Sequence, residues 1–75
     1  MFIKLSEEMQ RAVEMAVRTR IGETAIVDVS ATAEEVRQAF EDRNVAHEDI
    51  AASVAHFAAQ CGYPIELAGR VSLHA

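Results

Sequence analysis

The sequence has little of what stabilises a small secreted or membrane-anchored domain. It contains no tryptophan, one cysteine and one proline, and only 5% of its residues are aromatic. The single cysteine, Cys61, cannot form an intramolecular disulfide, and we expect it to be a small core residue. No apolar run approaches the roughly 20 residues that span a bilayer, and the N-terminus lacks the layout of a signal peptide. We therefore expect a cytoplasmic protein that makes no contact with a membrane.

Patterns for metals, phosphates and nucleophilic catalysis are also missing. The candidate metal ligands are His47, His56, His74 and Cys61. They form neither an i,i+4 histidine pair nor a Cys-x-x-Cys motif, and the glycines are isolated. Asp49, Ser53 and His56 have the residue types of a catalytic triad, but a nucleophilic serine needs a strained turn near oxyanion donors, and this serine lies mid-helix. We expect no enzyme activity and no cofactor.

The charge of the chain is unevenly distributed. The 75 residues carry a formal net charge of −5, with 51% hydrophobic and 25% charged residues, which fits one globular domain over residues 1–75. Residues 1–21 hold four basic and three acidic groups, whereas residues 22–75 hold three basic and nine acidic groups. An acidic surface repels nucleic-acid phosphates and attracts basic partners.

Periodicity predicts a helix, a strand and a second helix in the first part of the chain. Ser6 is a suitable N-cap for a helix that ends at Gly22. The apolar face of this helix consists of Leu5, Met9, Ala12, Val13, Ala16 and Val17. Residues 24–29 are rich in β-branched side chains and predict a short strand. Thr32 and Glu35 have the spacing of a capping box, which predicts a helix from Thr32 to about residue 43.

Residues 44–61 predict a helix that is apolar or small around most of its circumference and contains no lysine or arginine. Such a helix must be covered on two sides, by its own chain or by a partner. Gly62 and Pro64 end it. Residues 63–67 and 70–74 alternate apolar and polar side chains, which predicts a closing β-hairpin.

The predicted order is helix, strand, helix, tight turn, helix, strand, strand. Within this order, the last predicted helix and the two predicted strands contain three notable stretches: Asp49-Ile50, Gly62-Tyr63-Pro64-Ile65-Glu66 and Gly69-Arg70-Val71-Ser72-Leu73. They resemble the winged helix-turn-helix domains that open biotin protein ligase repressors. The resemblance covers about residues 31–74 and implies an α+β fold with three helices and a small antiparallel sheet. The chain departs from that family in three respects: the span from Phe57 to Gly62 is one residue longer, the wing is minimal, and the helix begins Ala46-His47-Glu48-Asp49, where the family has a hydroxyl cap and basic residues.

Our first hypothesis for function is a non-catalytic protein-interaction module, regulatory or adaptor, on this scaffold. Glu41 and Asp42 lie near the C-terminus of the second helix, where the helix dipole disfavours anions, so they are candidates for contact with a basic partner. Glu48 and Asp49 belong to the same acidic region. A small-residue ridge of Ala51, Ala55 and Ala59 would let another helix approach closely, either the first helix of the same chain or a second copy in a homodimer.

Two alternatives remain open. In a DNA-binding regulator the helix after the tight turn would present its polar stripe, Asp49, Ser53, His56 and Gln60, to the major groove. Arg43 and Arg70 would flank that groove. Affinity for DNA comes mainly from phosphate neutralisation, which Glu48 and Asp49 oppose, so we consider nucleic acid the less favoured partner. The second alternative is a small acidic inhibitor that occupies the basic groove of a nucleic-acid-binding protein.

Overall fold

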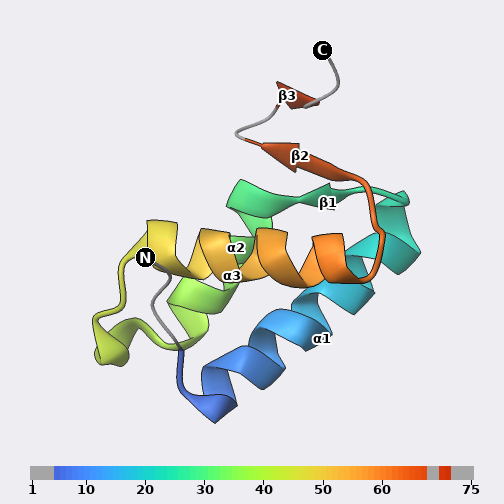
Figure 1. The fold of residues 1–75 in the computed structure, drawn as a ribbon. Helices are drawn as coiled ribbons and strands as arrows, with labels where there is room; N and C mark the ends of the chain where they lie inside the picture. Colours follow the sequence, from blue (N-terminus) through green and yellow to red (C-terminus); the bar gives the residue numbers. More distant parts are fainter. Residues whose placement is uncertain (1–4, 68–69, 72–75) are drawn as a thin grey trace.

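A computed structural model describes residues 5–67 and 70–71 of the chain. In order along the chain, its elements are α1 (Glu7–Thr24), β1 (Val27–Asp28), α2 (Val29–Ala39), the 3₁₀ turn η1 (Glu41–Arg43), α3 (His47–Gln60), β2 (Ile65–Leu67) and β3 (Arg70–Val71). The three helices pack against one another, and the small sheet lies beside them, with β1 in contact with α1 and β2 in contact with α2 and α3 (Figure 1). The predicted α+β class with three helices and a small sheet is therefore confirmed.

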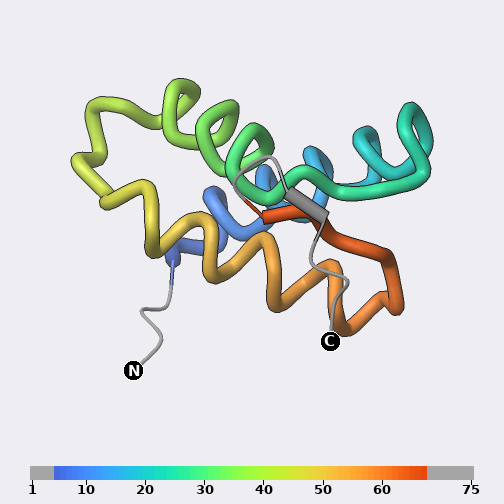
Figure 2. Tube along the Cα trace, turned by 90° about the horizontal axis from the view of Figure 1, so that it is seen from above, coloured from blue at the N-terminus to red at the C-terminus, as the bar shows by residue number. Residues whose placement is uncertain are grey.

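The sheet is mixed, which corrects the expected antiparallel arrangement. Its strand order is β1-β2-β3. β1 pairs with β2 in parallel, with Val27 opposite Ile65, whereas β2 and β3 are antiparallel, as the predicted hairpin requires. The parallel pairing arises because α2 and α3 together return the chain to the side of the molecule where β1 lies (Figure 2). A parallel neighbour needs such a crossover connection.

Helix α1 follows the prediction at its start and passes the predicted end. The Ser6 hydroxyl oxygen accepts a hydrogen bond from the Met9 N–H at 3.2 Å, as expected of an N-cap. The helix continues through Gly22 to Thr24 and closes at Ala25, which has the left-handed φ of 62°. The predicted end at Gly22 was wrong because a glycine within a helix is tolerated at a cost of about 1 kcal/mol.

Helix α2 begins earlier than the capping-box prediction. Asp28 is its N-cap, and the Asp28 carboxylate accepts a hydrogen bond from the Ala31 N–H at 3.0 Å. Thr32 is fully buried in the first turn and donates its hydroxyl to the Asp28 carbonyl at 2.7 Å. Glu35 forms an ion pair with Arg20 on α1 instead of returning to a cap. Because the aspartate ends the strand and caps the helix directly, the strand keeps only two residues.

The ends of α2 and α3 also differ from their predicted bounds. α2 ends at Ala39, and the residues expected in its last turn form η1. α3 ends as Gly62 predicts: this glycine has φ 77°, and the Tyr63 N–H donates to the Ala58 carbonyl at 2.9 Å, which is a helix-terminating arrangement. Cys61 is the C-cap residue and is exposed, so its expected place in the core is wrong.

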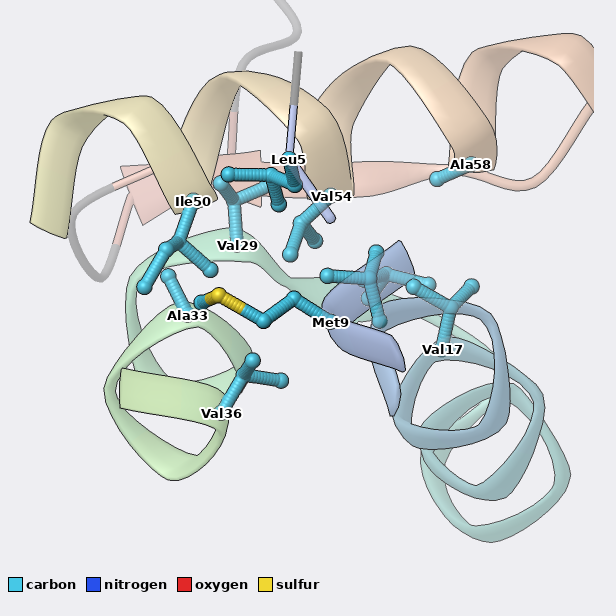
Figure 3. Packing of buried hydrophobic residues seen from close by; sticks show 11 residues of the cluster. Leu5, Met9, Val17, Val29, Ala33, Val36, Ile50, Val54 and Ala58 are labelled. Carbon is cyan, nitrogen blue, oxygen red and sulfur yellow. The ribbon is translucent and has the colours of Figure 1, made fainter. Parts of the chain in front are cut away.

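The core lies where the three helices and β1 meet. It consists of Leu5, Met9, Val13, Val17, Val27, Val29, Ala33, Val36, Ile50, Val54 and Ala58. The Met9 side chain extends between α2 and α3, close to Ala33 and Ile50 (Figure 3). The predicted apolar seam of α1 is thus confirmed, with Ala12 and Ala16 partly buried at its edge.

Candidate interaction surfaces

The predicted acidic residues gather at one end of the molecule, which we call the acidic end and define as Glu41, Asp42, Glu48 and Asp49. η1 and the first turn of α3 both lie there (Figure 1). Glu41, Asp42 and Glu48 are exposed, and Asp49 is half-buried. Glu48 and Asp49 lie in the first turn of α3, where the helix dipole stabilises carboxylates. Glu41 and Asp42 lie in η1, beyond the end of α2. The expected unfavourable interaction with the dipole of α2 is therefore not made within the last turn of that helix.

Most arginines of the described chain are engaged by its own carboxylates or rings. Arg20 pairs with Glu35 at 3.3 Å, Arg37 with Glu34 at 2.6 Å and Arg43 with Glu8 at 2.7 Å. Two guanidinium groups also stack on rings: the Arg18 group on Phe57 at 5.4 Å and the Arg43 group on Phe40 at 5.5 Å from the ring centroids. Arg43, expected beside a DNA groove, is thus tied to α1.

One of these ion pairs perturbs the ionisation of its partners. The hydrogen bonds from Arg37 lower the pKa of the Glu34 carboxyl, and Glu34 in turn raises the pKa of Arg37. Both groups are at the surface of α2, so the pair contributes little to stability. The pair keeps Arg37 on its own helix, where it neutralises a carboxylate of this chain and is not available to a phosphate.

The alanine ridge of α3 is only partly covered. Ala51 and Ala55 are half-buried and pack against the core, whereas Ala59 is exposed. The ridge is therefore not buried along its whole length by the described part of the chain. Of the residues suggested for DNA contact, Arg70 belongs to β3, where the structure describes the backbone alone.

The polar stripe of α3 is not the open surface that the DNA-binding hypothesis expected. Ser53 is buried, with 9% of its surface exposed, while His56 and Gln60 are exposed. These three residues line a hollow between α3 and α1 with a volume of about 130 Å³. Among the described residues, its lining is Gln10, Val13 and Glu14 of α1 and Ser53, His56, Phe57 and Gln60 of α3. We call it the α1–α3 hollow. The expected exposure of Ser53 is wrong because α1 crosses this side of α3.

Sequence reasoning missed the contribution of α1 to this hollow. Gln10 and Glu14 are one helical turn apart and lie beside Val13, a residue of the apolar seam. That spacing could have placed both polar side chains at the edge of the buried face. It could not have shown that α3, with Ser53, covers that edge.

A second depression lies on the other flank of α1, against α2, with a volume of about 250 Å³. We call it the α1–α2 groove, and it is lined by Ala12, Met15, Ala16, Thr19, Glu35, Val36 and Ala39. Met15 is the most exposed large apolar side chain of the described residues, at 68%. Its flexible thioether can adapt to different apolar surfaces.

Comparisons with known proteins give no relative: no family model matches the chain, and neither a curated protein nor a solved structure matches it. No helix within the described residues is long and apolar enough to cross a membrane. The same residues contain no group of three or more His, Cys, Asp or Glu side chains placed to hold a metal ion.

Proposed function

We propose that the chain is a small non-catalytic protein-interaction module, a regulator or adaptor, that binds a basic partner through its acidic end. The observation that carries this proposal is the unequal use of charge. Three arginines are in internal ion pairs, while Glu41, Asp42 and Glu48 are exposed and form no ion pair with any described residue. A surface with this balance attracts a cationic partner and repels a polyanion.

The element order supports a winged-helix-like scaffold, although the parallel pairing of β1 and β2 sets the sheet apart from the antiparallel one that we expected. The DNA-binding alternative draws less support from the site. Its Ser53 is buried and its Arg43 is engaged by Glu8. Direct readout needs side chains that reach base edges, and affinity needs cations that reach phosphates.

A binding titration tests the proposal. A lysine- and arginine-rich peptide and a DNA duplex of similar length are each titrated into the protein at low salt. We expect the peptide to bind and the duplex not to bind, with peptide affinity falling as salt is added. The double variant E41Q/D42N should weaken peptide binding by about fivefold, since each lost charge pair contributes up to about 1 kcal/mol.

The matched control is E7Q/E23Q, which removes the same charge from the two ends of α1 and should weaken binding by less than about twofold. Equal losses in both double variants would show that only net charge matters and would overturn the acidic end as a site. Tight, salt-sensitive duplex binding would overturn the proposal in favour of the DNA-binding regulator. Capture of a nucleic-acid-binding protein in competition with its own DNA would identify the inhibitor version.

A homodimer through the exposed part of the alanine ridge is compatible with this function. The exposed residue of the ridge is Ala59, and Ala52, which lies outside the ridge two turns earlier on α3, is also exposed. Light scattering at high protein concentration tests it, because a closed dimer doubles the mass and a monomer rules it out. A52E and A59E should then convert a dimer to a monomer, because a charge would be buried in the interface.

A further inference from the structure

We propose that the α1–α3 hollow is a pocket for a guanidinium group, the side chain of an arginine on the protein partner. This inference rests on the proposed function, because it names the anchor residue of the basic partner, but it concerns residues other than the acidic end. The hollow is lined by one carboxylate, one hydroxyl, one imidazole and two side-chain amides around an aromatic ring. These groups come from two helices and meet around one space of about 130 Å³.

Four of the polar side chains that line the hollow form no hydrogen bond with any described residue. Ser53 is about nine-tenths buried, yet its hydroxyl forms no hydrogen bond with any described residue, and neither do the side chains of Gln10, Glu14 and Gln60. No polar side-chain atom of the described residues is sealed from solvent without a partner, so the Ser53 oxygen remains reachable through the hollow. Buried polar groups are ordinarily paired, and an unpaired one in a pocket points to a ligand.

A guanidinium group fits the lining in chemistry. It is planar and offers five N–H donors in a fixed arrangement. The lining supplies acceptors in matching number: the Glu14 carboxylate oxygens, the Ser53 hydroxyl and the side-chain carbonyls of Gln10 and Gln60. Glu14 is the only carboxylate among the described residues of the lining and can bind a guanidinium through two parallel hydrogen bonds. A lysine ammonium has three donors and no flat face, so it would use fewer of these groups.

The size and the ring support the same occupant. A cavity of about 150 Å³ can hold a benzene molecule. A hollow of about 130 Å³ therefore has room for a guanidinium head and part of its aliphatic stem. Phe57 already accepts the Arg18 guanidinium on its ring, at 5.4 Å from the centroid, and shows that this ring stacks with the proposed group.

Arg18 also gives the proposal a distinctive consequence. Its cation lies beside the hollow, on the ring that lines it, and repels any second cation that enters. Removing that charge should therefore strengthen the binding of an arginine side chain, whereas a residue with a purely structural role would have the opposite effect or none. Among the described residues, the proposal therefore assigns opposite roles to two charged groups: Glu14 should help the ligand and Arg18 should oppose it.

The test uses the isotope-labelled full chain and short neutral-ended peptides with a single central arginine or lysine, observed by NMR. The arginine peptide should bind with a Kd on the order of 1 mM and shift the amide signals of Ser53 and Phe57, because one side chain makes few contacts. The lysine peptide should bind at least about threefold more weakly. E14Q should weaken arginine binding by about tenfold and S53A by about threefold, whereas R18A should tighten it about twofold.

The controls separate this pocket from the acidic end. E23Q removes the same charge from α1 outside the hollow and should leave binding of the single-arginine peptide unchanged. E41Q/D42N should also leave binding of the single-arginine peptide unchanged while it weakens binding of the lysine- and arginine-rich peptide. The pocket and the acidic end are therefore tested independently of each other. Equal affinity for arginine and lysine peptides, unchanged binding in E14Q, or weaker binding in R18A would each overturn the pocket. Tighter binding of free arginine than of the peptide would assign the hollow to a small molecule and overturn the assignment to a protein side chain.

Discussion

The two flanks of α1 carry opposite chemistry although they belong to one helix. Towards α2, the α1–α2 groove of about 250 Å³ is lined mainly by alanines, Met15 and Val36. Towards α3, the α1–α3 hollow of about 130 Å³ is lined mainly by polar side chains. The seam of Met9, Val13 and Val17 runs between them and is almost fully buried. This buried seam therefore packs against both α2 and α3. The residues on either side of it determine whether each flank presents an apolar or a polar surface to a ligand.

The two flanks of α1 also differ in how far their polar side chains are paired within the described chain. On the α2 side, Glu35 of the lining is paired with Arg20, and most of the other lining residues are apolar. On the α3 side, Gln10, Glu14 and Ser53 keep unused hydrogen-bonding capacity. Natural domains tolerate such a local cost where a ligand later satisfies it.

The largest expected loss of stability comes from replacing a residue that packs against both α2 and α3. Met9 is 2% exposed and extends between α2 and α3 (Figure 3). Met9→Ala should lower the free energy of unfolding by about 3 kcal/mol, because it removes buried methylenes and leaves a cavity between all three helices. Urea denaturation followed by circular dichroism measures this loss. Met9→Leu conserves volume and should cost less than about 1.5 kcal/mol, and an equal loss in both variants would contradict the packing account.

A smaller effect should be confined to the α2 side. Asp28→Ala removes the N-cap of α2 and should cost about 1 kcal/mol in the same measurement, whereas Asp28→Asn keeps a capping oxygen and should cost little. Because α2 does not line the α1–α3 hollow, binding of the arginine peptide should be unchanged in both variants. A large loss in the asparagine variant would show that the charge matters more than the cap.

The sequence predicted the elements whose signals are local. The apolar seam of α1, its Ser6 cap and the end of α3 at Gly62 each depend on residues within one or two turns, and the structure confirms them. The start of α2 was mispredicted because two capping residues, Asp28 and Thr32, stand four positions apart. The strand that precedes the helix decides between them, since Asp28 both pairs in the sheet and caps the helix.

Features that depend on distant parts of the chain could not be predicted. The parallel pairing of β1 with β2 depends on the path through α2 and α3, which no local pattern specifies. The burial of Ser53 and its approach to Glu14 depend on how α1 crosses α3. Periodicity correctly placed this serine on a polar stripe of α3, but it could not show that the stripe faces another helix.

A third substitution, on the α3 side, should stabilise the fold, whereas the two substitutions above destabilise it. Ser53→Ala removes a buried hydroxyl that forms no hydrogen bond with any described residue, and it places a better helix former in α3. It should therefore raise the free energy of unfolding by about 0.5–1 kcal/mol. The control is Ala52→Ser, at an exposed position of the same helix, which measures helix propensity alone. The gain in the first variant should exceed the loss in the second. A destabilised Ser53→Ala would mean that the hydroxyl supports the fold, which contradicts its assignment to a ligand.

The smallest effect lies on the outer surface of α2 and depends on pH. Arg37 lowers the pKa of Glu34 in the folded chain, so the pair stabilises the fold above the ordinary carboxyl pKa and loses this contribution as pH falls through the lowered value. Glu34→Gln should therefore be slightly less stable than the parent chain at neutral pH, and the two should converge on acidification. Urea midpoints at neutral and acidic pH measure the difference, and NMR titration of the Glu34 carboxyl gives its midpoint directly. A difference that persisted in acid would mean that Glu34 acts by packing, and a titration midpoint at the ordinary value would mean that solvent screens the pair completely.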